Sequence, residues 1–238
     1  MTLRTRFIEY RHGDVLLEGM LAWDDVLKGP RPAVAVAHTW AGRGEFECDK
    51  AKLLAGWGYA GFAVDMFGKG VRGSSAEENS ALIAPFMADR DLLAARINAG
   101  IDALATQPEA EAGKLAAIGF CFGGLCVLDL ARSGRDVKGV VSLHGLLQAP
   151  PQRSEKISAS ILCLHGYADP MAPPESVLAL GEELSAAAAD WQLHAYGNTL
   201  HAFTNPNAND RAFGTVYDPR AARRAWHSTR GFLQECLA

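Results

Sequence analysis

Cys121 is the residue whose setting most clearly suggests chemistry, because it stands between glycines in the run Gly119-Phe120-Cys121-Phe122-Gly123-Gly124. The spacing G-x-C-x-G matches the nucleophile elbow G-x-S-x-G, with sulfur in place of the hydroxyl. In that turn the strand and the helix approach too closely for side chains at the flanking positions, which favours glycine there. The motif alone is equally compatible with a buried structural cysteine, since free cysteine is among the most buried residue types.

A thiol nucleophile needs a base, and the base needs an acid that orients it. Asp169 and His201 follow Cys121 in the order nucleophile, acid, histidine, which is the chain order of α/β-hydrolases. His201 would take up the thiol proton, and the start of the helix after Cys121 would favour the thiolate. We therefore predict a catalytic triad of Cys121, Asp169 and His201, with an oxyanion hole formed by the backbone N–H groups of Phe122 and Trp40.

Each of these roles has a competing interpretation. Asp169 precedes a proline, and an Asp-Pro pair commonly marks a turn. Asp65 is a rival acid, although it follows an earlier strand, ahead of the elbow. His38, His144 and His165 also lie near predicted strand ends, and a lone histidine is more often a satisfied core or loop residue.

Apolar runs and helical periodicity indicate the elements that must position these residues. The sequence predicts a hairpin of strands at 7–10 and 15–21, and then buried strands at 33–38, 59–67, 114–120, 137–144, 160–166 and 191–196. Helices are expected at 45–58, 81–105 (with a break near Pro85), 122–132, 173–188 and 218–237. Loops are expected at 68–80, 147–156 and 202–217.

Strands that alternate with helices along the whole chain predict an α/β fold, with a mostly parallel central sheet and helices on both faces. Length alone is compatible with two small domains, but no shift in composition marks a linker, so we expect a single domain over 1–238. In such a sheet, ligands bind beyond the carboxyl ends of the strands. Cys121, Asp169 and His201 all fall at or beyond predicted strand ends.

The bulk composition excludes several classes of protein. The net charge is −4 and the Lys and Arg residues are scattered, which argues against a nucleic-acid surface. No window approaches ~18 consecutive apolar residues, so no membrane span is predicted. Five irregularly spaced cysteines without a C-x-x-C pair fit neither a disulfide framework nor a zinc ribbon. With no apolar leader near the first residues, we expect a cytoplasmic protein.

No metal or cofactor is expected. Cys163 and His165 lie on one predicted strand, but no further ligands occur at zinc-like spacing. Gly119, Gly123 and Gly124 do not fit the dinucleotide fingerprint G-x-G-x-x-G.

The chain resembles the dienelactone hydrolase family in three segments, Gly119-Phe120-Cys121-Phe122-Gly123-Gly124, His165-Gly166-Tyr167-Ala168-Asp169-Pro170 and His201-Ala202-Phe203. The cysteine elbow is the specific part, because most α/β-hydrolases have serine there. The resemblance extends over essentially the whole chain and includes His38-Thr39-Trp40-Ala41-Gly42 and Asp65-Met66-Phe67-Gly68. It implies the triad Cys121, Asp169 and His201 and the cleavage of an ester or lactone without a cofactor.

Two positions depart from the pattern of the best-known family members. Those members have a glutamate after the third strand, implicated in forming the thiolate, where this chain has Thr39. They also have an arginine shortly after the catalytic histidine, which holds a substrate carboxylate, where this chain has Thr-Asn-Pro at 204–206. The candidates for substrate binding are therefore Thr39, Lys69, Arg72 and Phe203, although charges at 69 and 72 are also typical of a solvated loop.

The favoured interpretation is a hydrolase that cleaves a carboxylic ester or lactone of small size through a thioester acyl-enzyme. The alternative is a catalytically weak or inactive family member that binds a small ligand. A thiol redox protein is a third interpretation, but Cys126 lies five residues beyond Cys121 and not in a C-x-x-C pair. The triad order favours the enzyme. The sequence indicates neither the natural substrate nor the oligomeric state.

Overall fold

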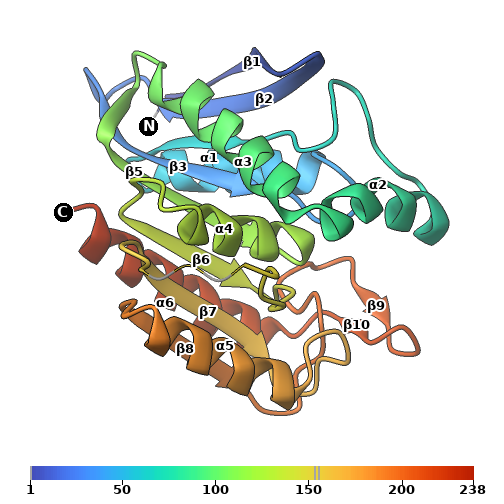
Figure 1. Ribbon diagram of the computed structural model, residues 1–238. Coiled ribbons are helices and arrows are strands. Elements are labelled where there is room, and N and C mark those ends of the chain that lie inside the picture. Colours follow the sequence, from blue (N-terminus) through green and yellow to red (C-terminus); the bar gives the residue numbers. More distant parts are fainter. Residues whose placement is uncertain (1, 153, 155) are drawn as a thin grey trace. The chain divides into compact units, whose positions relative to one another are not determined.

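The computed structural model describes residues 2–152, 154 and 156–238 (Figure 1). Positions 153 and 155 of the expected loop 147–156 lie outside the described residues. The chain divides into two compact units, Met1–Ile118 and Gly119–Ala238, which we call the N-terminal and C-terminal units. A single domain over 1–238 stays a prediction.

The N-terminal unit begins with an antiparallel hairpin of β1 (Leu3–His12) and β2 (Val15–Asp24). The predicted hairpin is confirmed, and both of its strands are longer than expected. Gly13 turns the chain with φ of +57°, a conformation that glycine adopts without strain. The strands of this unit follow in the order β1-β2-β4-β3-β5, which adds β3 (Arg31–Ala37), β4 (Ala60–Ala63) and β5 (Ala110–Phe120).

Helices cover both faces of the sheet in this unit. Gly61 of β4 faces α1 (Glu45–Gly56), where an added Cβ would lie 2.2 Å from the carbonyl oxygen of Ala51. Val64, three residues further on and therefore on the opposite face, contacts Gly100 of α3 (Arg90–Ala105). Glycines at 61 and 100 let both helices approach closely, as a double-sided α/β sheet requires.

The long helix expected at 81–105 is two helices, α2 (Ala76–Ala88) and α3. The break lies at Asp89 and not near Pro85, because Asp89 is extended and its carboxylate accepts a hydrogen bond from Leu92 N at 2.9 Å, which caps α3. The loop expected at 68–80 ends early for a similar reason. Ser75 caps α2 by accepting from Glu78 N at 3.1 Å.

The C-terminal unit contains the parallel strands β6 (Gly139–Leu143), β7 (Ser160–Gly166) and β8 (Trp191–Tyr196) in that order. Its helices are α4 (Phe122–Arg132), α5 (Pro174–Ala186) and α6 (Pro219–Cys236). The segment 202–217, expected as a loop, contains a small hairpin of β9 (Asn209–Asp210) and β10 (Thr215–Val216). Strands of two residues are too short to leave an alternating pattern in the sequence.

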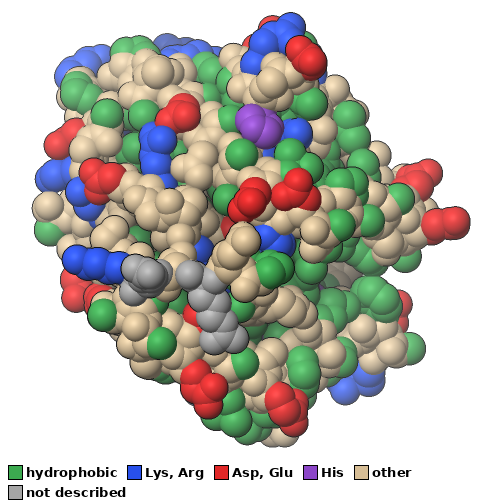
Figure 2. Space-filling view, in the orientation of Figure 1, with side chains coloured by type: hydrophobic (Ala, Val, Ile, Leu, Met, Phe, Trp, Pro, Cys, Tyr) green, Lys and Arg blue, Asp and Glu red, His purple; other side chains and the backbone are tan. Residues whose placement is uncertain are grey.

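The predicted fold class is confirmed. β3–β4, β6–β7 and β7–β8 pair in parallel, whereas β1–β2 and β2–β4 are antiparallel. Charges of both signs are interspersed over the face in Figure 2, in keeping with the scattered Lys and Arg residues of the sequence. Among the described residues, no helix is long and apolar enough to cross a membrane.

Candidate active site

Cys121 occupies the single residue between β5 and α4, with φ of 57° and ψ of −117°. A residue with a side chain adopts such a conformation only under strain, which is the expected state of a nucleophile in an elbow. Its N–H donates to the carbonyl of Leu143 at 3.2 Å, and its own carbonyl accepts from Gly124 N at 2.9 Å. These bonds tie the turn to the end of β6 and to the first turn of α4.

The flanking glycines are required by close contacts. A Cβ on Gly119 would lie 1.9 Å from the carbonyl oxygen of Gly123, and one on Gly124 would lie 2.5 Å from the α-carbon of Gly145. No real Cβ fits at such distances, so the backbones of the strand, the helix and the segment after β6 approach one another directly. The steric reason inferred for the motif is confirmed at Gly119, whereas Gly124 lies one residue beyond the second glycine of the motif, Gly123.

Asp169 and His201 are brought together. His201 Nδ1 lies 2.6 Å from Asp169 Oδ2, and both side chains are buried. Because the carboxylate accepts, Nδ1 carries a proton and Nε2 is left for other chemistry. The second carboxylate oxygen accepts from Met171 N at 2.8 Å, which fixes the acid in turn.

Two opposing influences act on His201. Burial is the largest single one and lowers the pKa of His201, because it disfavours the imidazolium. The charge of Cys121 and the hydrogen bond to Asp169 together outweigh burial and raise this pKa to about 10. Nε2 is buried and has no hydrogen-bond partner among the described residues, and the charge of Cys121 is the largest influence that raises the pKa of His201. The balance of these influences favours the imidazolium form of His201.

The segments that carry Asp169 and His201 brace each other. His201 N donates to Gly214 O at 3.0 Å, and Val216 N donates to His201 O at 3.0 Å, so the β9–β10 hairpin holds the histidine backbone. Gly214 has φ of +86°, and a Cβ there would meet the ring of Pro170 at 2.3 Å. The hairpin turn therefore packs directly on the residue after Asp169.

Phe203, predicted as a substrate-binding residue, has no exposed surface. Its ring lies edge-on to those of His144 and Tyr196, with centroids 5.2 and 5.4 Å away. A ring enclosed in this way packs in the interior beside His144, so we do not retain it as a substrate contact. His144, on the other side of that contact, lies edge-on to His201.

The two other strand-end histidines differ. His38 is a satisfied core residue, as the competing interpretation held. Met66 N donates to its Nε2 at 3.1 Å, which leaves Nδ1–H to donate to Thr39 O at 2.6 Å. His165 is buried with both ring nitrogens unpaired within the described part of the chain. Neither it nor Cys163 belongs to any group of three potential metal ligands among the described residues.

The residues predicted after β3 lie in the N-terminal unit. Trp40 is in a turn closed by a hydrogen bond from Gly42 N to Thr39 O at 3.3 Å. Glu47, which the sequence reasoning missed, is buried and binds this loop: its carboxylate accepts from Thr39 N at 3.2 Å and from Gly44 N at 2.8 Å. An acid at the third position of a helix is the capping signal that would have found it.

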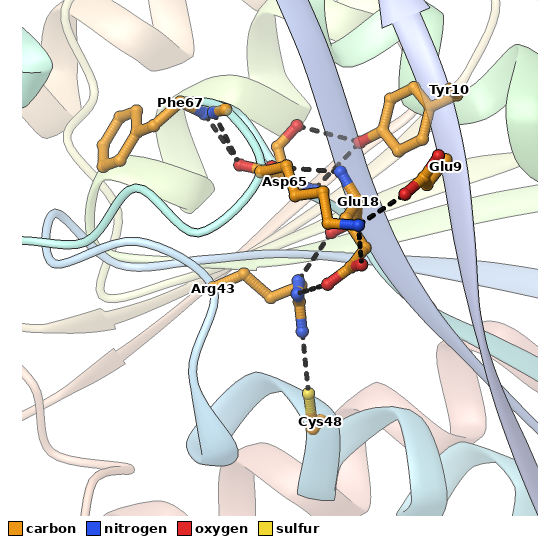
Figure 3. Close-up of polar contacts among 9 residues, drawn as sticks. Glu9, Tyr10, Glu18, Arg43, Cys48, Asp65 and Phe67 are labelled. Carbon is orange, nitrogen blue, oxygen red and sulfur yellow. Dashed lines mark hydrogen bonds and ion pairs between the residues drawn. The ribbon is translucent and has the colours of Figure 1, made fainter.

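Asp65, the rival acid, is committed to the backbone (Figure 3). Its Oδ1 accepts from Phe67 N and Gly68 N at 2.9 and 3.0 Å, and its Oδ2 accepts from Glu18 N at 3.1 Å. Tyr10 holds the Asp65 backbone through its hydroxyl. Asp65 therefore fixes the loop after β4.

Lys69 and Arg72, in the loop after Asp65, are the two cations that the sequence predicts as candidates for substrate binding. The Lys69 ammonium is paired with Glu9 and, at 3.2 Å, with Glu18. Arg72 is exposed and its side chain lies against Gly42. The solvated-loop interpretation fits Lys69 better than substrate binding does.

The comparison with protein families matches residues 17–237 to the dienelactone hydrolase family. A protein of Caenorhabditis elegans described as uncharacterised is 37% identical over 147 residues, covering 60% of this chain and 93% of its own length. A putative carboxymethylenebutenolidase of Yersinia pestis is 27% identical over 225 residues, covering 88% of this chain and 80% of its own. A solved structure of a dienelactone hydrolase-like promiscuous phosphotriesterase from metagenomic libraries is 34% identical and covers both chains fully, with a TM-score of 0.95.

Proposed function

Because the chain belongs to the dienelactone hydrolase family, we propose that it cleaves a carboxylic ester or lactone with Cys121 as nucleophile. The observation that carries the proposal is the buried hydrogen bond between His201 Nδ1 and Asp169, which orients the imidazole. The charge of Cys121 raises the pKa of the same imidazole. The relative described as a carboxymethylenebutenolidase supports an ester or lactone as the substrate class.

In the acylation step, the Cys121 thiolate attacks the substrate carbonyl carbon and forms a C–S bond. The oxyanion that develops is stabilised by backbone N–H groups, for which Phe122, directly after the nucleophile, is the proposed donor in the C-terminal unit, and the role of Trp40 stays a prediction from the sequence. His201 then gives its Nε2 proton to the alkoxide as the C–O bond breaks. The product of this step is a thioester and a free alcohol, or a ring-opened hydroxyacyl chain from a lactone.

In the deacylation step, neutral His201 accepts a proton from water, and the hydroxide attacks the thioester carbonyl. The C–S bond breaks, the carboxylic acid leaves, and the Cys121 thiolate again faces protonated His201. Asp169 stabilises the imidazolium in both steps. The chemistry consumes only water. Since Lys69 is already paired with two glutamates, we propose an uncharged substrate rather than one held by its carboxylate at that lysine.

The test is intact-mass trapping of an acyl-enzyme on a panel of an aryl acetate, a neutral γ-lactone and a carboxylate-bearing lactone. Wild type is expected to gain one acetyl group from the aryl acetate, with release of the phenol, and the full mass of the lactone from each lactone. Cys121→Ala is expected to form neither adduct. Cys48→Ala is the matched control, because Cys48 is also a half-buried free thiol. Undiminished turnover by Cys121→Ala would overturn the proposal. No adduct on wild type with any ester would favour the ligand-binding alternative.

The similarity to a promiscuous phosphotriesterase adds an aryl phosphotriester to the panel. The same thiolate would attack phosphorus, form a phosphorothiolate and expel the aryl oxide. Turnover of the phosphotriester that disappears together with esterase activity in Cys121→Ala would assign both activities to one nucleophile.

A further inference from the structure

His144 is a buried histidine beside the triad that the proposed mechanism does not use. It directly follows β6, and its ring meets that of His201 edge-on, with centroids 5.2 Å apart and planes inclined by 65°. Both side chains are buried. In a close-packed interior, such a contact limits the positions that the His201 ring can adopt.

The same ring is bonded to the segment that carries His201. The distance between His144 Nε2 and Thr204 Oγ1 is 2.7 Å, and Thr204, three residues after His201, is buried. Phe203 also lies edge-on to the His144 ring, at 5.2 Å. His144 therefore contacts three of the four residues at 201–204 and holds this segment at the end of β6.

The backbone on both sides of this contact is strained. His144 has φ of 39°, and Ala202, directly after His201, has φ of 57°. The N–H of His144 donates to Leu164 O of β7 at 2.8 Å, which locks the strained residue to the neighbouring strand. Such conformations persist where the surrounding structure demands them, and they concentrate at functional sites.

The groups that face His201 come from several elements: Cys121 at the start of α4, Asp169 after β7, His165 within β7 and His144 after β6. Burial, and then the charge of His201, hold the pKa of His144 well below its usual 6.5. The ring that packs against the imidazolium is therefore neutral and does not repel it.

We propose that His144 is a positioning residue for His201: through its ring contact and its bond to Thr204, it holds Nε2 of His201 toward Cys121. The inference rests on the proposed hydrolase function for its kinetic consequence. Its consequence for the pKa of His201 does not depend on turnover. A loosened His201 segment would weaken the attraction between the His201 imidazolium and the charge of Cys121.

The experiment compares Thr204→Val, which removes the hydroxyl and keeps the side-chain shape, with His144→Asn, which tolerates positive φ but loses the ring. With an aryl acetate, both variants are expected to lower kcat by about tenfold or more, with KM unchanged within about twofold. The pH at which activity falls on the alkaline side is expected to shift down by about half a unit or more, because His201 gives up its proton more readily.

Ser228→Ala is the matched control. Ser228 Oγ forms the same kind of bond, 3.1 Å long, with His194 Nδ1 on β8, and neither residue belongs to the proposed site. We expect this variant to leave kcat and the alkaline limb unchanged. The contrary result is that Thr204→Val lowers thermal stability while activity falls at the same alkaline pH as in wild type. In that case His144 has only a structural role, and the inference is overturned.

NMR titration of the histidine side chains separates this inference from the proposed function. A lower His201 pKa in Thr204→Val than in wild type supports the positioning role even if no ester is hydrolysed. An unchanged His201 pKa in Thr204→Val overturns it, whether or not esters are turned over.

Discussion

At the scale of single residues, His201 keeps its proton well above the pH at which an unfolded histidine loses it. Its pKa in the folded protein is about 10, against an ordinary 6.5. The stabilisation that the protonated residue contributes is therefore fully present below pH ~6.5 and is lost as the pH rises toward 10. Both the activity and the stability that depend on this charge should decline over that alkaline range.

Removing the charge of Asp169 tests this balance directly. We expect Asp169→Asn to lower kcat by roughly 10³–10⁴-fold, since the imidazole loses its orienting acceptor and its counter-charge. The alkaline limb of the pH–rate profile should also move to lower pH, because a cause of the raised His201 pKa has been removed. Asp136→Asn, which alters an exposed carboxylate paired with Lys138, serves as the control. A profile identical to wild type would contradict the assignment of Asp169.

At the scale of elements, the elbow between β5 and α4 depends on backbone approaching backbone. Gly119 and Gly124 leave no space for a methyl group, and the contacts they permit hold the strand, the helix and the end of β6 together. Cys121 is strained because the packed elements on both sides prescribe its conformation.

Two alanine substitutions in β5 test this dependence. We expect Gly119→Ala to destabilise the fold by about 1–3 kcal/mol or more, since the new Cβ would overlap the carbonyl of Gly123. Gly113→Ala, in the same strand with no atom within 4 Å of the new Cβ, should change stability by less than about 1 kcal/mol, in the stabilising direction. Urea unfolding of both variants provides the measurement. Equal effects would show that the close approach at Gly119 does not limit stability.

At the scale of the whole molecule, the five cysteines are free thiols with different surroundings. Burial raises the pKa of Cys163 to about 12, and burial also raises the pKa of Cys48 and of Cys236. Cys126 is buried. Cys121, half-exposed and facing a protonated imidazole, is the thiol best placed to react.

Alkylation with iodoacetamide at neutral pH tests this ranking across the chain. We expect peptide mapping to find Cys121 modified at least about tenfold faster than any other cysteine, because the thiolate is the reactive form. In denaturant, all five should react at similar rates. Faster labelling of Cys48 or Cys236 in the folded protein would contradict this ranking of the cysteines.

Much of the site could be predicted from the sequence because its signals are local or follow the fold's chain order. The elbow motif placed Cys121 between a strand and a helix, and the order of acid and histidine selected the two residues that the structure joins by a hydrogen bond. The errors fell at local features that hydrophobic periodicity does not mark. The helix break at Asp89 depended on a cap, and the β9–β10 hairpin on pairing across a turn.

The sequence by itself determined the α/β class, the elbow and the three residues expected to do chemistry. Backbone sterics require the periodicity and the glycine spacing, and the chain order of nucleophile, acid and histidine follows the fold. Only the tertiary structure decided which of the candidate side chains are already engaged with other parts of the protein. It engaged Asp65 with backbone N–H groups, paired Lys69 with two glutamates and enclosed Phe203. It also set His144 against both His201 and Thr204, since hydrogen bonds and ring contacts join residues that are far apart in the chain.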